Sequence, residues 1–185
     1  RSIFSQFPDS KLIVFVRSGI DFVRTATRLS GEDQTPVGWA PNAKNLSAVE
    51  RFVSLGRLAP RASDPLSGRW EQFDHLARNA WLWAETNRII QDAITAFPAS
   101  NVFEIRYEEF FRDVRASYPR LRSFLGLGGS IPDAVNDLLE RPINVRTEKV
   151  IGEFWTWEDS QRKIFVELAG SMMDRLGYGG IRTSK

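Results

Sequence analysis

The stretch KLIVFVRSGIDFVRTATR, residues 11–28, passes directly from an unbroken apolar run into a series of arginines. The run LIVFV at 12–16 is rich in branched and aromatic residues and follows the turn-forming sequence FPDSK, a pattern typical of a strand buried on both faces of a parallel sheet. Gly19 permits a tight turn after it, and a helix is predicted at about 20–30. The arginines therefore begin at the carboxyl end of a predicted buried strand.

A second strand and a long helical segment complete the outline of the fold. NVFEIRY at 101–107 alternates between two sets of side chains, as a strand does. The spacing of aromatic residues and alanines predicts the longest helix over 69–97, and further helices are expected at about 110–124, 132–139 and 157–176. Because a helical crossover joins the two strands, we expect them to pair in parallel within an α/β fold.

Length and sheet size set expectations about domain organisation. A chain of 185 residues with 42% hydrophobic content can bury one substantial core, so a single domain is expected over 1–185. Two strands are too few for a stable parallel sheet. We therefore expect that a further strand is hidden in the loops or belongs to a segment preceding RSIFSQF, where the sequence opens without an initiator methionine.

Composition excludes several kinds of site. Lys+Arg 25 against Asp+Glu 23 leaves a net charge of +2, and because the basic residues are scattered, broad nucleic-acid binding is disfavoured. The chain has no cysteine, which excludes disulfides, thiolate metal ligands and a cysteine nucleophile. No apolar run approaches the roughly 20 residues of a membrane span. Compartment and oligomeric state remain open.

The arginines suggest an anion site at the end of the first strand. In open parallel sheets, ligands bind at the carboxyl ends of the strands, where Arg17 is the first residue after the apolar run. Thr25 and Arg28 share one helical face with Asp21, so Arg17, Thr25 and Arg28 are candidate ligands of a phosphate dianion. The alternative for Arg24 and Arg28 is ordinary solvation, or pairing with acidic neighbours such as Asp21.

At this point the residues resemble a known family. FPDSKLIVFVRSGIDFVRTATR is similar to the 3′-phosphate-binding segment of sulfotransferases that use 3′-phosphoadenosine 5′-phosphosulfate (PAPS). In that family a proline-containing turn and a strand lead to an arginine, and a hydroxyl residue follows eight positions later. Arg17 and Thr25 occupy these two positions. The resemblance implies that both bind the 3′-phosphate of the nucleotide, assisted by Arg28.

Later motifs follow in the order of the same family. VFEIRYEEFFRD resembles the family's strand ending in RYE, which implies that Tyr107 lies near the nucleotide. LRSFLGL and MMDRLGYG resemble its FLGL and LGY motifs. PINVRTEKVIGEFW resembles the late basic loop that closes over the nucleotide, which implies phosphate contacts from Arg146 and Lys149. The order of the late motifs is most similar to the bacterial and tyrosylprotein-type sulfotransferases.

The resemblance implies a three-layer, P-loop-like fold and transfer of a sulfuryl group from PAPS to a hydroxyl or amine, with 3′-phosphoadenosine 5′-phosphate (PAP) as product, no metal and an unidentified acceptor. The family's PRSGTT-type phosphate loop does not occur in the sequence. We therefore expect this chain to carry the 3′-phosphate-binding half of the family domain, its C-terminal portion, and not to catalyse transfer alone. The alternative is a non-catalytic module that binds PAP, another phosphorylated ligand or a protein. A kinase-like enzyme is disfavoured because no Walker pattern is present.

Several residues are candidates for the general base of the reaction. His75, the one histidine, is the candidate catalytic residue because its ordinary pKa is near neutrality. The alternative is a surface or half-buried side chain on a long helix. Glu104, Glu108 and Glu109 are weaker candidates, and Glu108 as a structural partner of an arginine is the simpler interpretation.

Tryptophans and a second arginine group have competing interpretations. Trp81 and Trp83 invite comparison with adenine stacking, but helical spacing favours core packing for at least one of them. Trp39 and Trp155 are better candidates for a ligand. The segment GRLAPRASDPLSGR at 56–69 places three arginines among Gly and Pro, either as a rim for an acidic substrate or as a solvated loop; they are Arg57, Arg61 and Arg69.

Overall fold

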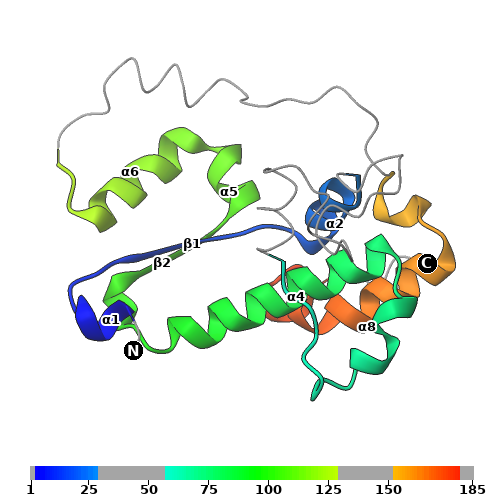
Figure 1. Ribbon diagram of the computed structural model, residues 1–185. Coiled ribbons are helices and arrows are strands. Elements are labelled where there is room, and N and C mark those ends of the chain that lie inside the picture. The colour runs from blue at the N-terminus through cyan, green and yellow to red at the C-terminus, as the bar shows by residue number, and fades with distance from the viewer. Residues whose placement is uncertain (1–2, 29–56, 129–151, 180–185) are drawn as a thin grey trace, which may run out of the picture. The chain divides into compact units, whose positions relative to one another are not determined.

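The structure is a computed structural model that describes residues 3–28, 57–128 and 152–179 (Figure 1). It divides into two compact units, each described below by itself. The first, the sheet unit, comprises Arg1–Ser18 and Ile90–Lys149, and the second, the helical unit, comprises Gly19–Ile89 and Val150–Lys185. The described residues are mostly helical and contain a two-stranded sheet flanked by helices, so the mixed α/β class is confirmed.

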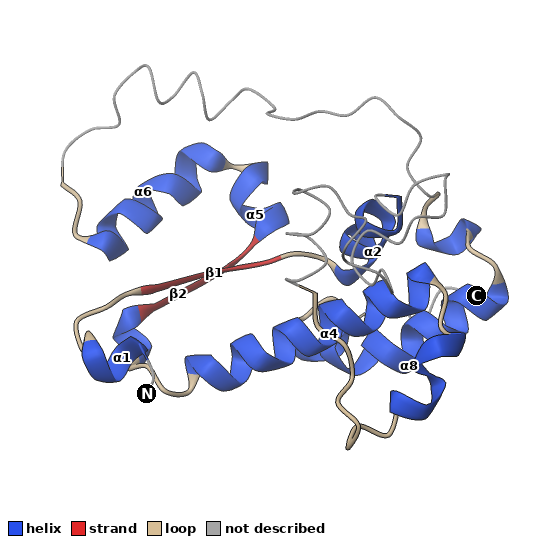
Figure 2. Ribbon diagram, viewed as in Figure 1, coloured by secondary structure: helices blue, strands red, loops and turns tan. Residues whose placement is uncertain are grey.

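The sheet unit is built on two parallel strands. β1, Leu12–Val16, pairs with β2, Val102–Arg106, so that Leu12 lies opposite Val102 and Val16 opposite Arg106. The predicted parallel pairing of the two strands is therefore confirmed. Figure 2 shows that α5 (Tyr107–Arg112) begins where β2 ends and that α6 (Val114–Leu125) follows it. The unit also holds the short helices α1 (Ile3–Gln6) and η3 (Ala99–Asn101).

The first strand is covered less completely than its sequence predicts. Val14 and Val16 are buried, but Ile13 and Phe15 on the opposite face keep 37% and 42% of their surface exposed. The ring of Phe15 is covered in part by Phe110 of α5, with ring centroids 5.0 Å apart. The prediction of a strand buried on both faces is thus wrong for this structure, in which the side chains of β1 alternate between buried and exposed.

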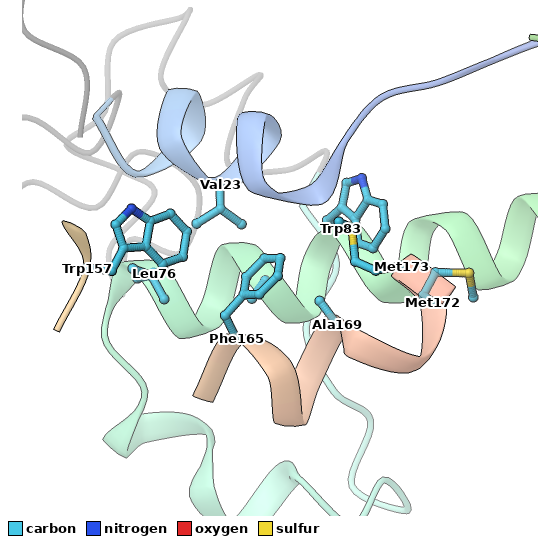
Figure 3. Close-up of a cluster of buried hydrophobic side chains, with 9 residues drawn as sticks. Val23, Leu76, Trp83, Trp157, Phe165, Ala169, Met172 and Met173 are labelled. Carbon is cyan, nitrogen blue, oxygen red and sulfur yellow. The ribbon is translucent and has the colours of Figure 1, made fainter. Parts of the chain in front are cut away.

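The helical unit contains the main hydrophobic core. Helices α2 (Gly19–Arg28), α4 (His75–Ile94) and α8 (Asp159–Arg175) each contribute to it, and α4 continues into the sheet unit at its C-terminal end. Val23 and Phe165 are fully buried in this cluster (Figure 3). Their neighbours in the cluster are Leu76, Ala80, Trp83, Trp157, Ala169, Met172 and Met173.

A second buried cluster continues this core along α4. It contains Ala77, Trp81 and Leu82 of α4, together with Trp70 and Phe73 from the segment before it. The ring centroids of Trp70 and Trp81 lie 5.3 Å apart in an edge-on arrangement. The predicted core role of the aromatic residues in this region is therefore confirmed.

Two predicted helices differ in their bounds. The helix expected over 69–97 begins only at His75, because Ser67–Gln72 forms the 3-10 helix η2 and Phe73 is extended. The helix expected at about 110–124 is interrupted at Asp113, whose carboxylate accepts the Ala116 N–H at 3.0 Å and so starts α6. The helix predicted at 132–139 lies outside the described residues.

The C-terminal helix agrees with its prediction. α8 follows the 3-10 helix η4, Phe154–Thr156, and starts with a capping box in which Glu158 and Gln161 exchange hydrogen bonds with each other's backbone. Within the described part of the chain, no helix has the length and apolar character needed to cross a membrane.

Candidate functional site

The carboxyl edge of the sheet brings together two of the predicted nucleotide ligands. Because Val16 and Arg106 are paired, Arg17 and Tyr107 both follow directly at the same end of the sheet. The Arg17 guanidinium lies over the Tyr107 ring, with Cζ 5.5 Å from the ring centroid. Both side chains are exposed, and Tyr107 retains 41% of its surface. A cation held against an aromatic face at this edge is a suitable partner for an anionic ligand.

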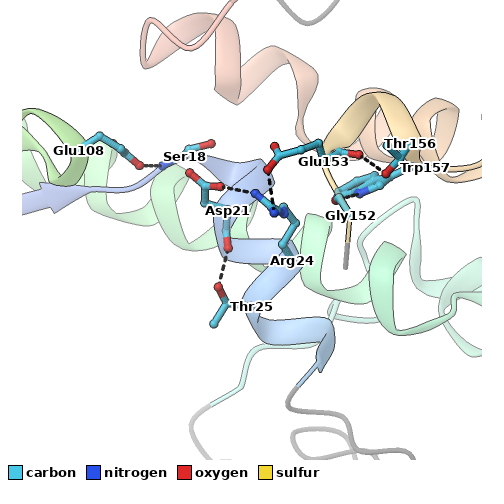
Figure 4. Close-up of polar contacts among 9 residues, drawn as sticks. All are labelled: Ser18, Asp21, Arg24, Thr25, Glu108, Gly152, Glu153, Thr156 and Trp157. Atoms are coloured by element: carbon cyan, nitrogen blue, oxygen red, sulfur yellow. Dashed lines mark hydrogen bonds and ion pairs between the residues drawn. The ribbon is translucent and has the colours of Figure 1, made fainter. Parts of the chain in front are cut away.

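A carboxylate fixes the backbone next to Arg17. The Ser18 N–H donates a hydrogen bond of 2.8 Å to Oε1 of Glu108, in the first turn of α5 (Figure 4). This bond links the residue after Arg17 to the residue after Tyr107. The two strand ends are therefore joined by a hydrogen bond as well as by the stacked side chains. Glu108, a weak candidate for the general base, thus has a structural partner in the Ser18 backbone, and its predicted pairing with an arginine stays a prediction.

Thr25 lies on α2 in the helical unit. Its side chain is exposed, and its hydroxyl donates a hydrogen bond of 2.8 Å to the carbonyl oxygen of Asp21, four residues earlier. This contact agrees with the predicted common face of the two residues. To donate to a phosphate oxygen, the Thr25 hydroxyl must give up this backbone bond.

Three predicted nucleotide ligands lie wholly or partly outside the described residues, so their roles stay predictions. Arg28 is the last residue of α2, and its side chain lies outside the description, as do Arg146 and Lys149 entirely.

Arg24 is a structural residue. Its Nη1 lies 3.3 Å from Asp21 and its Nη2 lies 3.0 Å from Oε1 of Glu153 (Figure 4). The Arg24 side chain is 18% exposed, so this double ion pair is partly shielded from water. The predicted pairing with Asp21 is confirmed. The sequence does not predict the contact with Glu153, because no local pattern links α2 to a residue so far along the chain.

The candidate base His75 is half-buried at the first position of α4. Burial lowers the pKa of the imidazole; the positive charges of Arg78 and Arg57 lower it further, whereas Asp74 raises it. Among the described residues, its buried Nδ1 has no hydrogen-bond partner. A neutral imidazole is the form that a general base requires, but no carboxylate within the described residues accepts a hydrogen bond from this ring to orient it. Its catalytic role stays a prediction.

The other two candidate bases have structural contacts, and one candidate ligand tryptophan is exposed. Glu104 accepts a hydrogen bond of 3.1 Å from Gln91, and Glu109 pairs with Arg120 at 3.2 Å. Trp155 is 70% exposed.

Both tryptophans of α4 are buried. Trp81 and Trp83 are 6% and 3% exposed, which confirms the core alternative. Trp39 lies outside the described residues.

Comparison with known proteins adds no relative: no protein-family model, no curated protein and no solved structure matches this chain. Function is therefore inferred from the chemistry of the residues and from the family resemblance of the motifs.

Proposed function

We propose that this chain is the nucleotide-binding portion of a PAPS-dependent sulfotransferase and that it holds the 3′-phosphate of PAPS and PAP. The observation that carries the proposal is the position of Arg17 and Tyr107, stacked and exposed at the carboxyl edge of two parallel strands. This edge is where parallel sheets bind ligands, and both residues occupy family positions that face the nucleotide.

The chemistry of Arg17 fits a phosphate dianion. A guanidinium presents a planar fork of donors that matches two phosphate oxygens, and its charge strengthens each hydrogen bond. Contact with the Tyr107 ring at 5.5 Å limits the rotamers available to Arg17 before a ligand arrives. Less side-chain entropy is then lost on binding. Thr25, Arg28, Arg146 and Lys149 would supply further contacts to the same nucleotide.

The proposed reaction is an in-line transfer of the sulfuryl group. The acceptor oxygen or nitrogen forms a bond to sulfur while the bond from sulfur to the 5′-phosphate oxygen breaks; the acceptor proton passes to a base, for which His75 is the candidate, and PAP leaves. The residues of this chain contribute by fixing the nucleotide so that its sulfur faces the acceptor. No step requires a metal.

Calorimetric titration with PAP tests the proposal. We expect the 185-residue chain to bind PAP and the Arg17→Ala variant to bind roughly tenfold or more weakly, because a hydrogen bond to a charged group contributes about 1.5–3 kcal/mol. Arg120→Ala is the matched control, since Arg120 is an exposed arginine of the same unit that pairs with Glu109. Equal affinity of wild type and Arg17→Ala would contradict the proposal.

A non-catalytic PAP-binding module is the second candidate. Such a module needs only the contacts to PAP, whereas transfer also needs the PRSGTT-type loop that binds the 5′-phosphosulfate in the family. The reading frame upstream of residue 1 separates the two functions. A strand followed by a PRSGTT-type loop in the same frame supports the enzyme, and an initiator methionine at this point supports the module.

A further inference from the structure

A groove in the helical unit shares no lining residue with the proposed nucleotide site. It has a volume of about 550 Å³, within the range of pockets that hold small organic ligands. One wall is the face of α4 that carries Trp81, Glu85, Arg88 and Ile89, at helical spacing. The other lining residues come from the segment 58–65 and include Leu58, Arg61, Asp64 and Pro65.

The loop wall has a defined shape. The Asp64 N–H donates to the carbonyl oxygen of Arg61 at 2.8 Å, and the Asp64 carboxylate accepts the Leu66 N–H at 2.8 Å. At its start the loop is attached to α4, because Arg57 donates a hydrogen bond of 2.5 Å to Oδ1 of the fully buried Asn79. The groove is thus built by an ordered loop against a helix.

The ionisable groups of the groove differ in what they contact. Arg88 donates two hydrogen bonds to Glu85, at 2.7 and 2.6 Å, so these two charges neutralise each other. The hydrogen bond from Arg88 and the charges of Arg88 and Arg61 lower the pKa of Glu85, against the opposing effect of burial. The carboxylate of Asp64 is engaged with its own loop. Within the described part of the chain, the exposed Arg61 guanidinium forms no direct ion pair, and its charge acts on Glu85 without a hydrogen bond between them.

Apolar side chains also line the groove. Trp81 is buried and lines the groove, and Leu58 and Ile89 leave 38% and 42% of their surface exposed. An apolar side chain next to a guanidinium suits a ligand that combines a hydrophobic body with one anionic group. The carboxylate or sulfate would take the fork of donors on Arg61, while the body covers Leu58 and Ile89.

We propose that this groove binds a small organic anion with an aromatic or aliphatic body, its anionic group on Arg61 and its body between Leu58 and Ile89. Of the three arginines in segment 56–69, Arg61 alone has this role, because Arg57 is bound to Asn79 and Arg69 pairs with Glu167 at 2.6 Å. The site is distinct from Arg17 and Tyr107 and is tested without the nucleotide.

Titration of the ¹⁵N-labelled chain with 3-phenylpropionate, 2-phenylethyl sulfate and the neutral 3-phenyl-1-propanol tests this site. The readout is the indole N–H signal of Trp81, assigned with Trp81→Phe. We expect both anions to shift this signal in a saturable manner and the alcohol to bind roughly tenfold more weakly. A preference for one anion over the other identifies the source, carboxylate or sulfate ester.

Two substitutions test which arginine binds the anionic group. Arg61→Gln should weaken both anions roughly tenfold and leave the alcohol unchanged, whereas Arg69→Gln, an exposed arginine of the same segment, should leave all three affinities unchanged. Thermal melting of each variant checks that the fold is retained. Lack of saturable binding by the wild type, equal affinities for anions and alcohol, or an unchanged affinity in Arg61→Gln would each overturn the proposal.

Discussion

Two neighbouring arginines of one sequence stretch have different roles. Arg17 is exposed and lies over an aromatic ring at a strand end, whereas Arg24 is 18% exposed and pairs with two carboxylates. The first is suited to bind a ligand. The second connects α2 to the segment that contains Glu153, within the helical unit.

This difference leads to a stability prediction for Arg24. Arg24→Ala removes contacts to Asp21 and Glu153 and should lower the free energy of unfolding by about 1 kcal/mol, the upper end of the range for partly exposed ion pairs. Chemical denaturation measures the change. Arg69→Ala is the control, because the Arg69–Glu167 pair is nearly half exposed on both sides and should contribute little. Equal effects of both substitutions would contradict this account.

Much of the residue-level picture follows from spacing along the chain. The pairing of Arg24 with Asp21 and the contact of Thr25 with Asp21 are separations of three and four residues, which the helical repeat predicts. The contact between Arg24 and Glu153, and that between Ser18 and Glu108, join segments far apart in sequence. No local pattern carries that information, because such contacts depend on how the elements pack.

At the scale of the element, Gly19 is required by packing. The sequence suggests a tight turn at this position, but Gly19 is the first residue of α2 and is not among the described glycines with positive φ. A Cβ built there would lie 2.9 Å from Sδ of Met173 and 2.9 Å from Cε3 of Trp83. The glycine therefore lets α2 approach α4 and α8 closely.

Gly19→Ala should consequently destabilise the chain. We expect a loss of about 1–3 kcal/mol, the usual cost of extra volume in a packed interior, measured by thermal or chemical denaturation. Gly68→Ala provides the control, because a Cβ at Gly68 meets nothing within 4 Å. A Gly19→Ala variant as stable as the wild type would mean that the close approach of these helices is relaxed in solution.

Element type was predictable from the sequence, and element ends were less so. The apolar run at 12–16 and the alternating segment at 102–106 carry the strand signal and form β1 and β2. The start of α4 was misplaced because the helical spacing of Trp70 and Phe73 continues across a 3-10 turn and an extended residue. The Asp74 carboxylate, which accepts the Ala77 N–H at 2.8 Å, is the capping signal that marks the true start.

At the scale of the whole molecule, the one histidine predicts a pH dependence of stability. Burial lowers the pKa of His75 in the folded chain, so the unfolded chain binds more protons at and below about pH 6.5, the ordinary histidine pKa. Stability should therefore fall as the pH drops from 7 through this window and rise again on return. Denaturation midpoints between pH 5 and 7.5 measure the slope.

The same prediction has an internal control. His75→Gln should flatten the dependence between pH 5 and 7.5, because the chain has no other histidine to titrate there. An unchanged slope in His75→Gln would contradict the assignment to His75.

Glu85 affects the stability of the chain in a separate, acidic pH window. Its pKa is lowered chiefly by its hydrogen bond with Arg88. The stabilisation of the folded chain by this group is therefore present above the ordinary glutamate pKa and is lost as the pH falls through the pKa of Glu85 in the folded chain.

The organisation of the whole molecule was the least predictable level. Parallel pairing followed from the helical crossover between the strands, but the division of the chain into two units, with α4 belonging to both, left no mark in composition. For the candidate nucleotide site, Arg17 was predicted from its residue type at a strand end and Tyr107 from the family resemblance, and these two residues are in contact. Their meeting depends on strand register, which only the folded chain fixes.

The central claim is that Arg17 recognises the 3′-phosphate itself, and one calorimetric cycle tests it most directly. PAP and AMP, which lacks the 3′-phosphate, are titrated into wild type and Arg17→Ala. We predict that the wild type prefers PAP by roughly tenfold or more and that the variant loses most of this preference while binding AMP as before. An Arg17→Ala chain that still prefers PAP over AMP by the wild-type factor would contradict the account.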